Sequence, residues 1–290
     1  MGLERATILP PGTPRNLDSR ISRAAAGRGA TDVRIKRAVA NAVVAQMLPS
    51  GVVKGGTAMQ LRRGQGGARF TPDLDASRGP GESVTDYIDA LAERLAEGWS
   101  GFTGRVAAMR KPQPEGVPDD YIMDPFEIAL AYKGRHWLTV EFELGRDEVG
   151  STLAAEPRMA REIVELFREL GLPEPRPVPV MSTPHQIAQK IHACTYVDPK
   201  THGNDRAHDL LDLQLLVREP DYDPSATRAV ARRLFEARRN QAWPPVVKGY
   251  ATWPTIYAKE RSGLDVISDS AEAVIWANAL IAAIDAADGS

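Results

Sequence analysis

The sequence predicts a bilobed protein in which an α/β lobe is followed by a mainly α-helical lobe. Residues 32–170 mix helical periodicity with short apolar runs and one stretch of strand-like alternation. Residues 171–184 are rich in proline, which is typical of a boundary between lobes. Almost every segment after residue 184 has helical spacing. We therefore expect a loosely ordered basic arm over residues 1–31, the α/β lobe over 32–180 and the helical lobe over 181–290.

The first lobe is predicted to begin with an amphipathic helix at Asp32, whose apolar residues recur every three or four positions up to Met47. Pro49-Ser50-Gly51 ends this helix, and a short strand at Val52-Val53 then runs into a second helix opened by two glycines. The remaining expected elements of this lobe are a strand at 73–75, a helix at 86–97, a strand at 137–144 and a helix at 156–170.

Four helices are expected in the second lobe, over residues 185–196, 206–218, 225–240 and 269–286. The third of these is strongly basic, because it carries Arg228, Arg232, Arg233, Arg238 and Arg239. Such a helix contacts an RNA backbone or simply presents a solvated face, and the sequence leaves both interpretations open.

The composition is that of a folded globular protein, with 290 residues of which 43% are apolar and 26% charged. No apolar run approaches the ~18 residues of a membrane span, and the N-terminal segment lacks the apolar core of a signal peptide. We therefore expect a cytoplasmic protein with no membrane contact. The single cysteine, Cys194, excludes an internal disulfide and a thiolate metal cluster.

The charge distribution is uneven along the chain, although the net charge is only -2. Residues 1–69 carry twelve Lys or Arg against three acidic residues, so the rest of the chain has a net charge of -11. A basic region next to acidic residues suits a polyanionic partner such as a nucleotide or a nucleic acid. A soluble basic arm explains the same pattern.

Two aspartates form the first candidate catalytic motif. Asp73 and Asp75 alternate with Leu74 on the expected strand, so both carboxylates share one face while Leu74 points into the core. Mg²⁺ is typically held by one or two carboxylates and completed by substrate phosphates. We predict that Asp73 and Asp75 bind Mg²⁺ or Mn²⁺.

Gly55-Gly56-Thr57 forms the second motif, at the start of the helix that follows Val52-Val53. The first turn of a helix presents unpaired N–H groups and the positive end of the dipole, and glycine leaves room for a phosphate. Seventeen or so residues separate this turn from the two aspartates. A phosphate-binding turn beside an acidic strand is what nucleotidyl transfer requires.

A third set of residues lies on the expected helices of the second lobe. Asp212 is surrounded by leucines, which predicts a buried carboxylate in need of a cation, and Lys190 is its natural partner. A solvated or snorkelling lysine is the alternative for Lys190. Asp209 lies one turn before Asp212 and either joins this pair or binds Arg206.

Four segments together resemble the AbiEii/AbiGii family of nucleotidyltransferase toxins, and its MenT branch in particular. They are Lys-Gly-Gly-Thr-Ala-Met at 54–59, Arg-Phe-Thr-Pro-Asp-Leu-Asp at 69–75, Gln-Ile-Ala-Gln-Lys-Ile-His-Ala at 186–193, and Asn-Asp-Arg-Ala-His-Asp-Leu-Leu-Asp-Leu at 204–213. The order is that of the family, and the resemblance covers most of the chain apart from the first thirty residues.

The resemblance implies a lobe related to the DNA polymerase β nucleotidyltransferases and a toxin that works with a cognate antitoxin. Such a toxin adds nucleotides from an NTP to the 3′ acceptor end of tRNA and so blocks aminoacylation and translation. In this interpretation Asp73, Asp75, Lys190 and Asp212 are catalytic, with Lys190 gripping the triphosphate and Asp212 holding that lysine. The matched motifs make Lys54, Gly55, Gly56, Thr57 and Thr71 candidate nucleotide-binding residues; Asp209, Arg69 and the strand residue Glu141 are further candidates.

Two other functions remain open from the sequence. An antibiotic-type nucleotidyltransferase would use the same groups to modify a small hydroxylated molecule. A catalytically silent member of the fold would only bind RNA or a protein partner.

Overall fold

The computed structural model describes residues 8–112, 122–198 and 200–287. The chain divides into two compact units, of which the first contains the residues up to Gln65 together with Phe70–Asp147 and Glu156–Val180. The second contains Met181 onward and two short segments, Gly66–Arg69 and Glu148–Ala155. Two excursions of the chain within its first 155 residues therefore belong to the second unit, a feature that the sequence did not predict.

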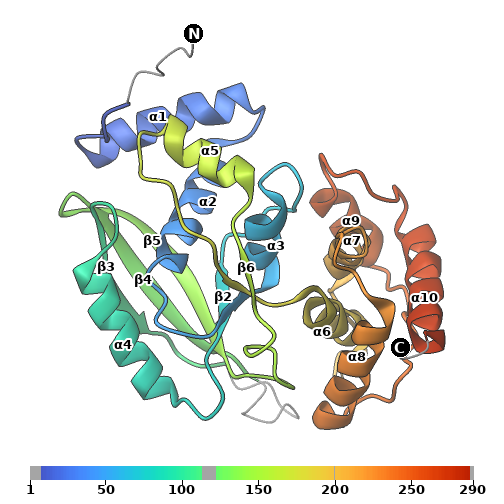
Figure 1. The fold of residues 1–290 in the computed structure, drawn as a ribbon. Helices are drawn as coiled ribbons and strands as arrows, with labels where there is room; N and C mark the ends of the chain where they lie inside the picture. The colour runs from blue at the N-terminus through green and yellow to red at the C-terminus, as the bar shows by residue number, and fades with distance from the viewer. Residues whose placement is uncertain (1–7, 113–121, 199, 288–290) are drawn as a thin grey trace. The chain divides into compact units, whose positions relative to one another are not determined.

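The first unit is built on one mixed sheet with the strand order β3-β4-β5-β2-β1-β7-β6 (Figure 1). The strands are β1 Val52–Lys54, β2 Leu74–Ser77, β3 Phe102–Ala108, β4 Asp124–Tyr132, β5 Arg135–Gly145, β6 Glu156–Arg158 and β7 Val178–Val180. Strand β2 pairs antiparallel with β1 and parallel with β5, and β1 pairs parallel with β7. The short strands β1 and β2 are thereby central in the sheet.

One face of the β4–β5 ribbon is buried and the other is exposed. Phe126 and Ile128 of β4 are buried, as is Phe142 of β5, whereas Glu127 and Glu141 alternate with them on the exposed face. The helices therefore cover the apolar face. Glu127, Glu141 and Glu143 on the other face are exposed.

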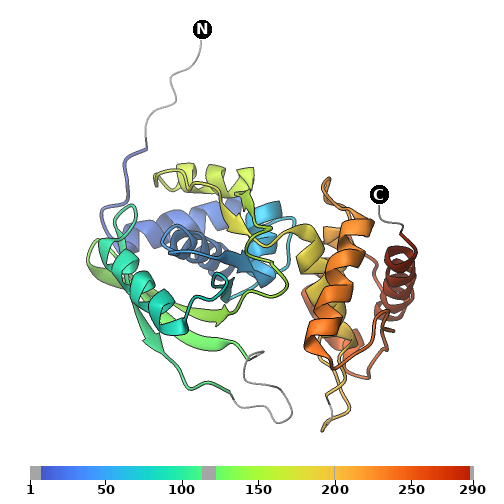
Figure 2. The same ribbon diagram turned by 60° about the horizontal axis from the view of Figure 1, so that its bottom comes forward.

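The described residues of the first unit also form five helices, of which α1, α2 and α5 gather beside the sheet (Figures 1 and 2). They are α1 Pro14–Gly27, α2 Asp32–Ala45, α3 Gly55–Arg63, α4 Val84–Glu97 and α5 Arg161–Glu169. Helices α2 and α4 follow the predicted periodicity. Tyr87 of α4 stacks on Phe142 of β5 with ring centroids 6.4 Å apart, which anchors the helix on the core.

The start of the chain differs from the expected loose arm over residues 1–31. Residues 1–7 lie outside the described part, but α1 buries Leu17 and Ile21 in the core. Arg20 donates to the carbonyl of Leu170 at 2.7 Å, and the Tyr132 hydroxyl donates to the carbonyl of Pro11 at 2.7 Å. Residues 8–31 are thus an integral part of the first unit, because long-range partners that the sequence does not reveal hold them.

The expected helix over residues 156–170 is shorter than predicted. Glu156–Arg158 forms β6, which pairs antiparallel with β7, and the helix begins only at Arg161. Pro157 explains the difference, because a residue that precedes proline is driven toward extended conformations and proline lacks an N–H.

The second unit is helical, with α8 lying beside α6 (Figure 2). Its helices are α6 Thr183–Thr195, α7 Ala207–Leu216, α8 Pro224–Arg238, α9 Trp253–Glu260 and α10 Ser270–Ala286. The sequence predicted four of these but not α9, which buries Trp253 and Tyr257 and accommodates Pro254 in its first turn. No helix of the described residues combines the length and apolar character needed to cross a bilayer.

Candidate active site

The turn from β1 into α3 is shaped by close approach of the acidic strand. Gly55 has a left-handed φ of +63°, and a Cβ at this position would lie 1.9 Å from Oδ2 of Asp75. A Cβ on Gly56 would lie 2.7 Å from Cβ of Thr71. Only glycine at both positions lets the segment that bears the two aspartates pack against the start of α3. The candidate metal-binding carboxylate of Asp75 therefore lies directly beside a helix N-terminus.

Asp73 is fixed in this place by buried polar contacts. The Thr71 hydroxyl donates to Oδ1 of Asp73 in a short hydrogen bond. The backbone carbonyl of Asp73 accepts from Oγ1 of Thr57 at 2.7 Å and from Nδ2 of Asn41 at 3.0 Å. Asn41 also donates to the Thr57 hydroxyl at 3.0 Å, which completes a network linking α2, α3 and the acidic segment.

Two expectations are refined by this network. Only Asp75 lies within β2, since Asp73 occupies the bend just before the strand. The Thr57 hydroxyl, buried and bonded to the Asp73 carbonyl, positions the acidic segment. Thr71, also buried, has the same kind of role through the Asp73 carboxylate.

A row of three charged residues crosses the centre of the sheet. The register places Lys54 of β1 opposite Asp75 of β2, and Asp75 beside Glu143 of β5. Directly paired residues of neighbouring strands project to the same face, so these side chains are neighbours. A Cβ on Gly145 would lie 2.7 Å from Nζ of Lys54, which shows that the lysine side chain extends across β2 toward the end of β5.

The register distinguishes the two glutamates of β5. Glu143 is the residue paired with Asp75 of β2, whereas Glu141 lies two positions earlier on β5, where it pairs with Glu127 of β4. Alternation in Val140-Glu141-Phe142-Glu143 shows that both glutamates share a face, but only strand pairing distinguishes them.

The carboxylates fit a metal that takes part of its ligands from the substrate. Among the described residues, no group of three His, Cys, Asp or Glu side chains forms a ready metal cluster. Asp73 and Asp75 instead offer hard oxygen ligands beside a glycine turn, which matches the carboxylate-plus-phosphate coordination typical of Mg²⁺.

The second unit contains a buried cluster of opposite charges. Nζ of Lys190 on α6 lies 2.5 Å from Oδ2 of Asp212 and 3.0 Å from Oδ1 of Asp209, both on α7. Nε of Arg69 lies 3.1 Å from the same Asp212 oxygen, and Nε of Arg206 lies 3.5 Å from Oδ2 of Asp209. The predicted pairing of Lys190 with Asp212 is present, and Asp209 binds Lys190 and Arg206 together.

Electrostatics keep Lys190, Arg69, Asp209 and Asp212 ionised. Burial alone would lower the pKa of Lys190, but the charges of Asp209 and Asp212 outweigh it and raise that pKa. Burial would raise the pKa of both aspartates, but Lys190 on Asp209, and Arg69 together with Lys190 on Asp212, lower them. The pKa of Arg69 is raised because the two carboxylates outweigh its burial. The cluster is thus a preorganised set of charges with a rigid lysine.

The predicted residues belong to two different units. Lys54, Gly55, Gly56 and Thr57 share the first unit with Thr71, Asp73, Asp75 and Glu141, whereas Arg69, Lys190, Asp209 and Asp212 belong to the second. Sequence reasoning missed Asn41 and Glu143. A lone amide in the otherwise apolar stretch of α2 was the signal for Asn41.

A mixed sheet with a glycine turn against an acidic strand, joined to a helical unit, defines the fold class as that of the nucleotidyltransferases. The solved structure of MenT4, a nucleotidyltransferase toxin from Mycobacterium tuberculosis H37Rv, has this fold with a TM-score of 0.52 and 17% sequence identity, over 92% of this chain and 98% of that one. The chain belongs to the AbiEii nucleotidyltransferase toxins of type IV toxin–antitoxin systems, whose family model matches residues 37–280. No curated protein sequence matches it. The family match confirms the family that the four sequence motifs resemble, and the likeness to the solved structure confirms the fold.

Proposed function

We propose that the protein transfers a nucleoside monophosphate from an NTP to the 3′-hydroxyl of an RNA, with the acceptor end of tRNA as the substrate. The packing of Asp75 against Gly55 carries this proposal, because it brings a metal-binding carboxylate to the N-terminus of a helix. The modified tRNA can no longer be aminoacylated, which accounts for toxicity in the cytoplasm.

In this proposal the phosphates of the NTP bind the first turn of α3, because the first N–H groups of a helix have no partner within the helix and attract an anion. Mg²⁺ or Mn²⁺ on Asp73 and Asp75 would neutralise phosphate charge and polarise the α-phosphate. Lys54, in the row with Asp75, adds positive charge on the same face.

Lys190 binds the triphosphate with the third N–H of its ammonium group, because the other two point at Asp209 and Asp212. Arg69, which binds Asp212, is separated from Asp73 by only three residues of chain. One short segment of chain thus carries a member of the charge cluster and a member of the acidic pair.

The reaction forms one bond and breaks one. The 3′-oxygen of the RNA attacks the α-phosphorus, the bond to the β-phosphate oxygen breaks, and pyrophosphate leaves. The hydroxyl proton passes to a carboxylate, for which Glu143 is placed beside Asp75. Positioning and charge stabilisation supply the rate, since the protein forms no covalent intermediate in this scheme.

The test is incubation with total tRNA, Mg²⁺ and each labelled NTP in turn, followed by sequencing of the RNA 3′ ends. We expect added nucleotides with the unmodified chain and none with Asp73→Asn, Asp75→Asn or Lys190→Met. Label in small molecules but not in RNA would instead identify an antibiotic-type enzyme. Tight RNA binding without pyrophosphate release would identify a silent binding protein.

Membership of a toxin–antitoxin family implies an antitoxin partner. Expression of the chain alone is expected to arrest growth, and co-expression of a neighbouring small gene to restore it. Growth arrest by the folded Asp75→Asn variant would contradict a catalytic basis for toxicity.

A further inference from the structure

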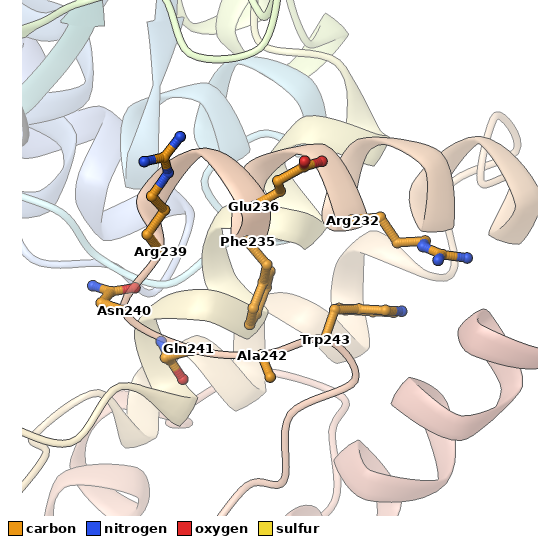
Figure 3. Close-up of a pocket in the computed structure, with 8 residues that line it drawn as sticks. All are labelled: Arg232, Phe235, Glu236, Arg239, Asn240, Gln241, Ala242 and Trp243. Carbon is orange, nitrogen blue, oxygen red and sulfur yellow. The ribbon is translucent and has the colours of Figure 1, made fainter.

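The second unit has a pocket of about 660 Å³ at the C-terminal end of α8 (Figure 3). Its lining residues come from the last two turns of the helix and from the loop that follows: Arg232, Phe235, Glu236, Arg239, Asn240, Gln241, Ala242 and Trp243. Figure 3 shows Arg232 and Arg239 at opposite ends of this row, with Glu236 between them and Phe235 pointing toward the loop. The pocket thus combines two cations, one carboxylate and aromatic surface.

The five arginines of the α8 segment divide into two groups. Arg228 donates to the Ala287 carbonyl at 3.1 Å, and Arg238 binds Glu148 at 2.6 Å, so both hold the unit together. The side chains of Arg232, Arg233 and Arg239 are exposed and make no hydrogen bond or ion pair with any residue that the structure describes. Two of these three line the pocket, where their charge is available to an anionic ligand.

A buried network preorganises the far side of the pocket. His192 of α6 shares a hydrogen bond of 2.8 Å with Oδ1 of Asn240, and its other ring nitrogen accepts from Arg238 at 2.9 Å. Burial, reinforced by the positive charge of Arg238, lowers the pKa of His192 to about 4, so the ring stays neutral. Gln241 donates to the His192 carbonyl at 2.9 Å. The loop is therefore held in one conformation before any ligand binds.

Trp243 is fixed as a half-buried aromatic surface. Its Nε1 donates to Asp285 at 2.7 Å, and its ring packs edge-on against Phe235 at 5.4 Å between centroids. A half-exposed indole with a fixed orientation is the kind of platform on which an unstacked base stacks.

We propose that this pocket binds one nucleoside of a single-stranded RNA segment, with its base on Trp243 and the flanking phosphates on Arg232 and Arg239. The inference rests on the proposed function, because it assigns a binding site for the RNA substrate of that reaction. Arg232 and Arg239 lie seven positions apart, a rise of about 10 Å along a helix, which suits successive phosphates of a chain better than one small anion. Glu236 accepts hydrogen bonds from a 2′-hydroxyl or an exocyclic amine, groups that an inorganic polyanion lacks.

Fluorescein-labelled U10 and A10 RNA are the probes, titrated with the full-length protein in the absence of NTP at several salt concentrations. The variant Arg232→Gln/Arg239→Gln is expected to bind at least tenfold more weakly. Each lost phosphate contact reduces the slope of log K against log salt by about 0.7 for a single strand, so the double variant loses about 1.4. Arg233→Gln is the matched control, because it removes an exposed arginine of the same helix outside the pocket.

Trp243→Ala is expected to weaken binding by about tenfold, as loss of a base-stacking residue does, while Trp243→Phe keeps binding within about threefold. Thermal unfolding of each variant shows whether it folds; should Trp243→Ala fail to fold, the arginine variants decide the matter. DNA of the same sequence is expected to bind more weakly than RNA. Triphosphate is expected to compete poorly.

The pocket variants are expected to raise KM for RNA and to leave kcat and KM for the NTP unchanged. If the double variant and Arg233→Gln bind RNA equally well and have the same KM for RNA, the inference is overturned. Nucleotide transfer by the unmodified chain would still uphold the proposed function in that case. Unchanged RNA binding with loss of antitoxin neutralisation would assign the pocket to a protein partner and equally overturn it. Absence of transfer by the unmodified chain, with RNA binding lost in the double variant, would refute only the proposed reaction.

Discussion

Replacing Gly55 with alanine tests the central geometry of the candidate active site. The left-handed φ of +63° costs a residue with a Cβ about 1–2 kcal/mol. The new methyl would also lie 1.9 Å from Oδ2 of Asp75, so the carboxylate has to move by more than 1 Å to reach an ordinary contact distance. A displacement of about 1 Å of a reacting group can lower the rate by about 100-fold. We therefore expect Gly55→Ala to reduce kcat/KM for nucleotide transfer by at least that factor.

Gly29 offers a matched control for this substitution. It has nearly the same backbone conformation, with φ at +60°, and a Cβ there meets no atom within 4 Å. Gly29→Ala should therefore lower the free energy of unfolding in urea by about 1–2 kcal/mol and leave nucleotide transfer unchanged. Equal transfer rates in the two variants would refute the claim that the approach of Asp75 to the turn underlies activity.

Three further predictions concern the other charged residues. Lys190→Met leaves two buried carboxylates without their shared cation and should lower the free energy of unfolding by about 3–5 kcal/mol, which urea titration measures. The folded-state pKa values of Asp209 and Asp212 lie below the ordinary value of about 3.9. The two ionised carboxylates therefore contribute fully to stability above that pH, and this contribution is lost as the pH falls through the folded-state pKa values. Urea titrations between about pH 5 and pH 2 should therefore show a steep acid loss that Asp209→Asn/Asp212→Asn makes shallower; parallel curves would contradict the assignment. Glu143→Gln should reduce transfer by about 100-fold or more if it accepts the proton, and Glu141→Gln should change it less than about threefold; the reverse order in single-turnover assays would restore Glu141 as the third acid.

Prediction from the sequence worked best where the signal is local. The helix that begins at Asp32 and the strand Val52-Val53 followed their periodicity, and the glycine turn lies where two adjacent glycines required it. The pairing of Lys190 with Asp212 was predictable because a carboxylate among leucines has to find a cation.

Prediction failed where distant partners decide the conformation. Proline-rich residues 171–184 contain the division between the two units, after Val180, but they also form β7, whose pairing with β1 and β6 the sequence did not predict. Residues 8–31 are poor in strong local signals yet are held by Tyr132 and Leu170, more than a hundred residues further along the chain.

The amino-acid sequence by itself determined the candidate residues of the site: a glycine turn, an aspartate pair and a lysine that needs acidic partners. These features depend on neighbouring residues in the chain, where backbone sterics and burial act over a few positions. Tertiary structure alone decided that Glu143 rather than Glu141 lies beside Asp75, and which arginines of α8 remain available to a ligand. The pairing of Asp75 with Glu143 and the ion pair of Arg238 with Glu148 join residues up to about 90 positions apart. The conformational preferences of neighbouring residues do not determine which of these distant partners meet.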